Sequence, residues 1–208
     1  MAGPRIFLLS PARCGGPRAQ MLFNPEARFD LAVRLRELGG APLGEVFSFL
    51  SGLYFRGKLA YARAFGRPAQ GIAQGYVITS NRGLLPVDTL TTLEDLRSFG
   101  EVDIESSDVR YREPLQRTAR ELLRGAAGSE IVLLGSVASG KYVDVLLEMF
   151  GSWLTFPQEF VGRGDMSRGG LMLRCVDENR ELTYVPVVGA VRNGKRPPKL
   201  KRRTSASL

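Results

Sequence analysis

Short apolar segments alternate with amphipathic helical segments along this chain, and this alternation limits the possible folds more than any other feature. The segments "RIFLLS" (residues 5–10), "GYVITS" (75–80) and "EIVLLG" (130–135) have the uninterrupted apolar pattern of buried strands. Strands buried on both faces are typical of parallel sheets, in which helices connect one strand to the next. We therefore expect an α/β fold with a mainly parallel central sheet, helices on both faces and a single domain over residues 1–191.

Four segments have helical patterns. In "NPEARFDLAVRLRELGG" (24–40), Asn24 is the expected N-cap, Pro25 the first helical residue, and Gly39 lies past the end. In a second segment, residues 47–65, aromatic residues are interspersed with Arg56, Lys58 and Arg63. These aromatic side chains could stack on nucleic-acid bases, although their helical spacing is more typical of a hydrophobic core. Gly52 and Gly57 weaken its helical continuity. The other three helices are predicted over residues 47–65, 112–125 and 142–151.

Three further segments have strand patterns. In "EVDIES" (101–106), apolar and polar residues alternate as in an edge strand. The segments "GGLMLRC" (169–175) and "ELTYVPVV" (181–188) are predicted to form a terminal strand pair, because a turn-forming stretch separates them.

The positive charge is concentrated at the C-terminal end. The chain has 29 Lys and Arg residues against 21 Asp and Glu residues. Residues 192–208 contain seven of these cations and no acid, which leaves 22 basic and 21 acidic residues in the rest. The segment contains two consecutive prolines and lacks apolar periodicity, so we expect a disordered basic tail that attracts phosphates.

The absence of histidine excludes several kinds of site. Ser-His-Asp and Cys-His catalysis and every His-ligated metal site need an imidazole. The two cysteines, Cys14 and Cys175, are too few for a zinc cluster. We expect no metal and no cofactor, and any chemistry must use carboxylate, Lys, Arg, Ser, Tyr or backbone groups. With no long apolar run and no secretory leader pattern, the expected location is the cytoplasm.

The stretch "IVLLGSVASGKY" (131–142) resembles a phosphate-binding loop up to its last residue. Gly140 and Lys141 have the right spacing, but Tyr142 stands where a short hydroxyl would ligate magnesium. We therefore do not expect nucleotide hydrolysis. Backbone amides from Ser136 onwards, with Lys141 nearby, could still bind an anion at the start of the following helix.

Two further candidate site segments each follow a predicted strand. "SPARCGG" places Arg13 and Cys14 after the first strand, where a nearby cation could lower the pKa of the Cys14 thiol. "SNRGLLPVD" places Arg82 and Asp88 after the second predicted strand. Because open parallel sheets bind ligands at the carboxyl ends of their strands, we expect these loops to share one polar cleft.

A later glycine-rich segment, "FVGRGDMSRGGLML", completes the expected cleft. Its Arg163, Ser167 and Arg168 suit phosphate or carboxylate recognition, and Asp165 could orient them or act as a base. A solvated turn without a binding role explains the segment equally well.

Three motifs resemble those of a known family. "IFLLSPARCGG", "YVITSNRGLLPVDTL" and "LLGSVASGKYVDVLLEMF" are similar to segments of the peroxide-stress YaaA family and of related small bacterial and phage proteins, in an order that covers roughly residues 5 to 175. The resemblance implies an α/β fold distantly like the uracil-DNA glycosylase superfamily, DNA binding as in some members, and Tyr142 as a family position. It also places Gly164, Asp165, Ser167 and Arg168 at that superfamily's minor-groove loop.

The chain departs from the glycosylase pattern at two places. After the first strand it has Arg13 and Cys14 instead of a carboxylate or amide, and it lacks the histidine of the late loop. We therefore expect a cytoplasmic, nucleic-acid-associated and DNA-binding protein with an anion-binding cleft. The alternative is an enzyme that acts on a nucleobase or nucleoside, with Asp165 or Asp88 as general base.

Overall fold

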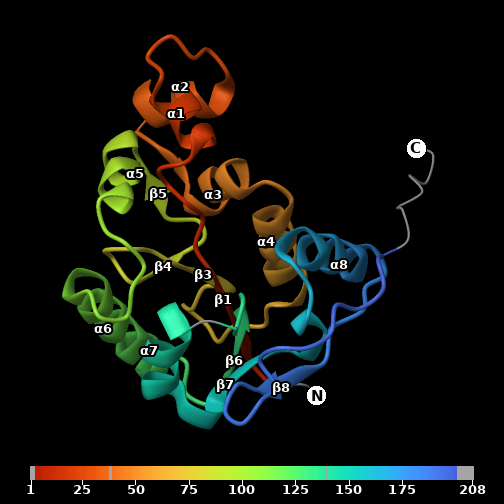
Figure 1. The fold of residues 1–208 in the computed structure, drawn as a ribbon. Helices are drawn as coiled ribbons and strands as arrows, with labels where there is room; N and C mark the ends of the chain where they lie inside the picture. Colours follow the sequence, from red (N-terminus) through yellow and green to blue (C-terminus); the bar gives the residue numbers. More distant parts are fainter. Residues whose placement is uncertain (1–2, 38, 139, 201–208) are drawn as a thin grey trace.

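A six-stranded sheet forms the centre of the computed structural model, which describes residues 3–37, 39–138 and 140–200 (Figure 1). The strand order is β4-β3-β1-β6-β7-β8. Its four middle strands are parallel, and β4 and β8 are antiparallel edge strands. The predicted α/β fold with a mainly parallel sheet is confirmed. The strands are β1 (Arg5–Leu9), β3 (Gly75–Ile78), β4 (Leu84–Pro86), β6 (Glu130–Leu134), β7 (Leu154–Pro157), β8 (Tyr184–Pro186), and a separate pair, β2 (Ala41–Pro42) and β5 (Leu90–Thr91).

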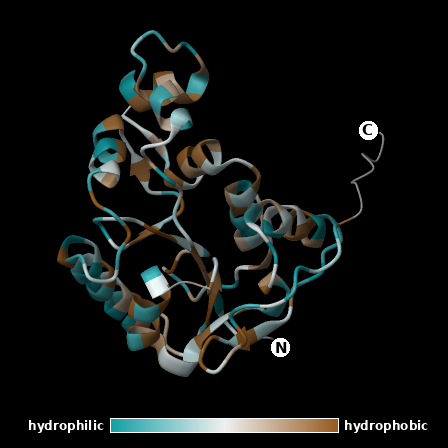
Figure 2. Ribbon diagram, in the orientation of Figure 1, coloured by the Kyte–Doolittle hydropathy of each residue, from teal (hydrophilic) through white to brown (hydrophobic). Residues whose placement is uncertain are grey.

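Helices cover both faces of this sheet, as predicted. Alternate residues of β1 contact opposite cores: Phe7 and Leu9 pack under α3, α4 and α8, whereas Ile6 and Leu8 pack under α6 and α7. The central strands are accordingly hydrophobic in Figure 2. The helices are α1 (Pro17–Phe23), α2 (Asp30–Glu37), α3 (Leu43–Ser51), α4 (Leu53–Phe65), α5 (Leu93–Gly100), α6 (Val109–Gly125), α7 (Gly140–Phe150), α8 (Asp165–Asp177), and the short 3₁₀ turns η1 (Gly151–Trp153) and η2 (Gln158–Phe160).

The strand predicted over residues 169–175 is wrong, because this segment lies inside helix α8. Two glycines allow α8 to pack directly on α4. A Cβ atom at Gly57 would lie 2.6 Å from the carbonyl oxygen of Gly169, and one at Gly169 would lie 2.7 Å from that of Leu53. Gly169 therefore serves helix packing and does not mark the start of a strand.

Residues 101–106 form no strand, although their alternation of polar and apolar residues is real. Val102 and Ile104 pack against the core under α6 and α7, while Asp103 and Glu105 are exposed. The segment buries every second side chain without pairing to the sheet, which explains the strand-like pattern.

Two predicted helix boundaries are corrected. Asn24 ends α1, since its N–H donates to the carbonyl of Gln20, and its side chain accepts from the amide of Glu26 at 3.0 Å. This local turn delays the start of α2 to Asp30. The helix predicted over 47–65 is two helices that meet at Gly52, whose φ of 63° is left-handed. The helices predicted over 112–125 and 142–151 are confirmed as α6 and α7.

The first part of the predicted tail packs on the folded body. Residues 192–200 form no helix or strand, as expected, but Leu200 contacts the core under α4 and α8. The backbone carbonyl of Lys195 lies where a side chain at Gly162 would be, and Arg192 lies 3.9 Å from Asp144. The predicted disorder of residues 201–208 concerns a segment outside the described residues.

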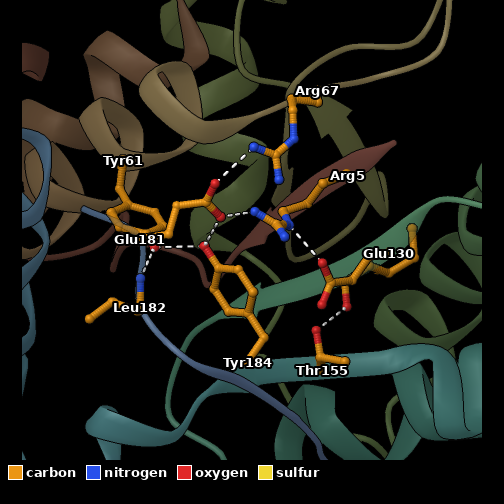
Figure 3. Close-up of polar contacts among 9 residues, drawn as sticks. Arg5, Tyr61, Arg67, Glu130, Thr155, Glu181, Leu182 and Tyr184 are labelled. Atoms are coloured by element: carbon orange, nitrogen blue, oxygen red, sulfur yellow. Dashed lines mark hydrogen bonds and ion pairs between the residues drawn. The ribbon is translucent and has the colours of Figure 1, made fainter. Parts of the chain in front are cut away.

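Charged and phenolic groups close the amino edge of the sheet (Figure 3). Arg5 at the start of β1 pairs with Glu130 of β6 at 2.6 Å and also with Glu181, which accepts from Arg67 at 2.8 Å. The hydroxyls of Tyr61 and Tyr184 are 2.6 Å apart in the same cluster. These contacts link α4 and the segment before β8 to the start of β1. We call these six residues the amino-edge cluster.

Candidate functional site

A cleft of about 770 Å³ lies at the carboxyl edge of the sheet. Parts of four segments form its walls, 11–15, 79–80, 99–105 and 141–142, together with Phe47. The first follows β1, the second follows β3, and the fourth begins α7 after β6. The expected convergence of strand-end loops is thus present for three neighbouring parallel strands.

Two cations in this cleft have no partner among the described residues. Arg13, in the loop after β1, and Lys141, in the first turn of α7, are exposed and form neither a hydrogen bond nor an ion pair there. Asp103 and Glu105 line another part of the cleft and have no ion pair in the described part of the chain. Glu105 accepts from the amide of Ser106 at 3.1 Å. The cleft therefore presents charges of both signs that are not held in ion pairs.

The deeper cleft wall is aromatic. Phe47 of α3 and Phe99 of α5 both line it, and their rings meet edge to face with centroids 6.2 Å apart. Both side chains are almost fully buried, so they contribute only a small apolar surface to the cleft. The combination of an apolar floor and a few polar groups is typical of small-molecule sites.

Tyr142, which stands where a phosphate-binding loop has a short hydroxyl residue, stabilises the segment that resembles such a loop. The Tyr142 hydroxyl donates to the backbone carbonyl of Ser136 at 2.8 Å and also hydrogen-bonds to Ser10. Ser136 itself does not line the cleft. At the start of α7, a side chain at Gly140 would overlap the carboxylate of Asp144. A negative charge already occupies this helix end, which disfavours binding of a second anion by the backbone amides of the first turn.

In the glycine-rich segment around residues 162–170, the charged side chains bind to groups of the segment itself and of the residues just before it. Arg168 is buried and donates to the carbonyl of Phe160 at 3.2 and 3.3 Å, with Asp165 at 3.4 Å. Arg163 donates to the carbonyl of Glu159 and to the Ser167 hydroxyl at 3.2 Å. This segment forms the first turn of α8 and the preceding bend, and it does not line the cleft.

The candidates after β3 separate to opposite edges of the sheet. Arg82 remains at the carboxyl edge, pairs with Asp95 at 2.5 Å and does not line the cleft. Asp88 follows β4, which runs antiparallel to β3 and returns to the amino edge, where Asp88 pairs with Arg63 at 2.7 Å. The two residues therefore do not face one ligand.

Cys14 lines the cleft but has a poorly reactive thiol. It is buried, its Sγ donates to the carbonyl of Ala12 at 3.6 Å, and burial raises its pKa to about 12. The possibility that a nearby cation lowers the pKa of this thiol is not realised, because desolvation dominates.

Sequence reasoning missed Lys58, which is fully buried behind the cleft. Its Nζ donates to the backbone carbonyl of Ser10 at 2.6 Å and to the Ser10 hydroxyl at 2.9 Å. The same nitrogen lies 4.3 and 4.6 Å from the ring centroids of Tyr54 and Phe55. Ser10 comes directly after β1, so α4 places an amine at the carboxyl end of the central strand.

Burial lowers the pKa of Lys58 to about 7. The charge of Asp165 opposes this shift, and the charge of Arg168 reinforces it. No carboxylate of the described residues lies within ion-pair distance of Nζ. A substantial fraction of this amine is consequently uncharged at neutral pH.

A sequence signal for Lys58 did exist. Tyr54, Phe55 and Leu59 are buried on the same face of α4, and Lys58 follows Tyr54 by four residues and Phe55 by three. That spacing places the lysine on the apolar face of the helix, where a cation is unusual.

The fold and the cleft define an α/β protein with an open, mostly parallel sheet and a polar cleft at its carboxyl edge. Comparison with models of protein families, with curated proteins and with solved structures gives no match to this chain. Among the described residues, no group of three Cys, Asp or Glu side chains is placed to hold a metal ion. No helix of the described part is long and apolar enough to cross a bilayer.

Proposed function

We propose that this protein binds nucleic acid and takes up one nucleotide unit in the carboxyl-edge cleft. The observation that carries the proposal is the pair of exposed, unpartnered cations, Arg13 and Lys141, beside an aromatic wall. Guanidinium and ammonium groups without a carboxylate partner are available to contact phosphate. A volume of about 770 Å³ suits a ligand of nucleotide size.

The carboxylates of the cleft could make it selective for the base or sugar of the bound nucleotide. Asp103 and Glu105 can accept hydrogen bonds from base amino groups or sugar hydroxyls, while the cations contact the phosphate. Such a division needs charges of both signs that are not held in ion pairs within one cavity, which this cleft provides. The resemblance to the YaaA family supports DNA as the polymer, because some members of that family bind DNA.

The test is the binding of short fluorescent oligonucleotides, measured by anisotropy with single-stranded DNA, duplex DNA and RNA in parallel. We expect the double variant Arg13→Ala/Lys141→Ala to lose about tenfold or more in affinity and to lower the salt slope by up to about 2, since each phosphate contact contributes roughly 0.9. Arg120→Ala, an exposed arginine on α6, is the matched control. Unchanged affinity in the double variant would refute a binding role for the cleft.

A truncation after Leu200 separates the tail from the cleft. It removes Lys201, Arg202 and Arg203, so the salt slope should fall by up to about 3. A nucleoside monophosphate should compete with the oligonucleotide at the cleft in the full-length and truncated proteins alike. Competition lost on truncation would assign binding to the tail.

The alternative, an enzyme acting on a nucleobase, needs a carboxylate in the cleft. The predicted bases Asp165 and Asp88 do not line it, whereas Asp103 and Glu105 do. Release of free base during the titration, detected by chromatography and lost in Asp103→Asn or Glu105→Gln, would favour this alternative over binding alone.

A further inference from the structure

We propose that Ser10 and Lys58 form a nucleophile–base pair that attacks an electrophilic ester reaching the carboxyl edge of the sheet. The inference does not depend on nucleic-acid binding, because the pair is defined by contacts behind the cleft wall. It is carried by the 2.9 Å contact between the Lys58 amine and the Ser10 hydroxyl. A serine whose hydroxyl meets a buried amine is a recognised arrangement for nucleophilic catalysis without histidine.

The surroundings of Lys58 suit both of its protonation states. In the structure Nζ donates to both the Ser10 carbonyl at 2.6 Å and the Ser10 hydroxyl at 2.9 Å, and it lies over the rings of Tyr54 and Phe55. A free amine can keep the carbonyl contact and turn its lone pair to the Ser10 hydroxyl, which then becomes the donor. After it accepts a proton, the same carbonyl and rings, with the carboxylate charge of Asp165, stabilise the ammonium ion. Proton transfer therefore requires the hydrogen bond between Ser10 and Lys58 to reverse, with no change in the positions of the heavy atoms.

The position of Ser10 connects this pair to the cleft. Ser10 does not line the cleft itself, but Pro11, which follows it in the sequence, and Tyr142, which hydrogen-bonds to it, both do. A Cβ at Gly135 would lie 2.9 Å from both the Ser10 Cβ and the Tyr142 hydroxyl. Because residue 135 is a glycine and has no side chain, the Ser10 side chain and the Tyr142 hydroxyl can occupy this space. Ser10 is 5% exposed and so almost fully buried, next to residues of the cleft wall.

The proposed reaction needs only Ser10, Lys58, the ester and water. The neutral Lys58 amine takes the Ser10 hydroxyl proton as Oγ bonds to the carbonyl carbon or phosphorus of the ester. The ester alcohol leaves and takes the proton back from the Lys58 ammonium group. Water then cleaves the seryl ester with Lys58 again as the base.

The test uses a fluorophosphonate reagent, which modifies activated serines, on the full-length protein with mass spectrometry of the product. Ser10 attacks the phosphorus, fluoride leaves, and Lys58 takes the proton. We expect one phosphonyl group at Ser10, with a rate that rises about tenfold per pH unit below roughly pH 7 and levels off above roughly pH 8, as the amine loses its proton. The ionisable groups near the pair are Tyr54, Tyr142, Asp165 and Arg168.

Three variants identify the roles. Ser10→Ala should not be modified, Lys58→Met should react about a hundredfold more slowly, and Ser129→Ala, a buried serine at the opposite end of β6, should react as the wild type. A fourth variant, Lys58→Arg, is used in case Lys58→Met does not fold, because arginine keeps the charge but cannot take the proton. An unmodified Ser10 across the pH range, or equal rates in the wild type and a folded Lys58 variant, would overturn the proposal.

Two model esters then distinguish the substrate class. The wild type, but not Ser10→Ala, should release nitrophenolate from p-nitrophenyl acetate if it acts on acyl esters, and from bis(p-nitrophenyl) phosphate if it acts on phosphodiesters. Release from either with the pH profile of labelling supports the pair. Equal release by Ser10→Ala counts against it. Neither assay contains nucleic acid, so their failure leaves the oligonucleotide titration unaffected.

Discussion

The two edges of the central sheet differ in how far their cations are paired with carboxylates. At the amino edge, Arg5 and Arg67 each face a carboxylate, and the phenols of the amino-edge cluster bond to one another (Figure 3). At the carboxyl edge Arg82 pairs with Asp95. There, however, Lys58 is buried and Arg13 is exposed, each without a carboxylate partner in the described part of the chain. Both edges carry several cations, so the difference lies in pairing and not in composition.

This difference separates stability from binding. Paired and hydrogen-bonded charges hold elements together because removing one partner leaves the other without compensation. Free charges contribute little to folding, and a buried amine with a lowered pKa opposes it, but both are available to a ligand or a reaction. The amino edge therefore joins the C-terminal segment to β1, and the carboxyl edge is where ligands are expected.

The largest expected effect concerns the pH dependence of stability at Lys58. The amine has a pKa of about 7 in the folded protein and about 10.4 when unfolded, so between these values the unfolded chain binds the additional proton. The contribution of Lys58 to the free energy of unfolding should then rise by about 3 kcal/mol from about pH 7 to pH 9.5. Above about pH 8.5 the Cys14 thiol, whose pKa burial raises to about 12, offsets part of this rise in the wild type and in Lys58 variants alike. Urea unfolding at a series of pH values measures this rise.

Lys58→Met removes the titrating group and should flatten that rise. The comparison is restricted to values below about pH 10, because the raised pKa of Tyr61 and of other buried phenols lowers stability above that value. If the variant kept the full pH dependence of the wild type, some other group would be responsible, and Lys58 would be a permanently charged residue.

A smaller effect is expected at the amino edge. Arg5→Met should lower the free energy of unfolding by about 2 kcal/mol, because Glu130 and Glu181 lose a shared, largely buried partner. The partial exposure of both carboxylates keeps the effect below that of a fully buried pair. Thermal or urea unfolding at neutral pH gives the value.

The matched control for Arg5 is Arg63→Met, which breaks the exposed pair with Asp88. In that pair the side chains are 52% and 70% exposed, and the loss should stay within about 0.5 kcal/mol. Equal losses in the two variants would show that the amino-edge cluster contributes no more than an ordinary surface pair.

The sequence predicted the centre of the sheet because burial alone determines it. The strands β1, β3 and β6 are apolar runs that pack on both faces, and no other structure buries such short runs as well. Residues 169–175, which lie inside α8, were predicted as a strand because a turn-forming stretch separates them from the apolar segment 181–188. Only the neighbouring helix α4 explains Gly169, and a contact between distant segments leaves no local pattern.

The cleft was predictable only in part, for a related reason. Strand-end loops indicated Arg13, Cys14 and Lys141, which line the cleft, since parallel strands place such loops at one edge. They also indicated Asp88, but an antiparallel edge strand carries that residue back to the other edge. Lys58 was missed because its role depends on what lies opposite its helix, namely the end of β1.

The smallest expected effect on stability is at the rim of the cleft. Arg13→Ala and Lys141→Ala, singly or together, should change the free energy of unfolding by no more than about 0.5 kcal/mol, because neither side chain has a partner to lose among the described residues. Urea unfolding at neutral pH measures this. The same double variant is expected to lose oligonucleotide affinity, so binding and stability would separate at one pair of residues. A stability loss as large as that of Arg5→Met would mean that these cations support the fold, and the contrast between the two edges would disappear.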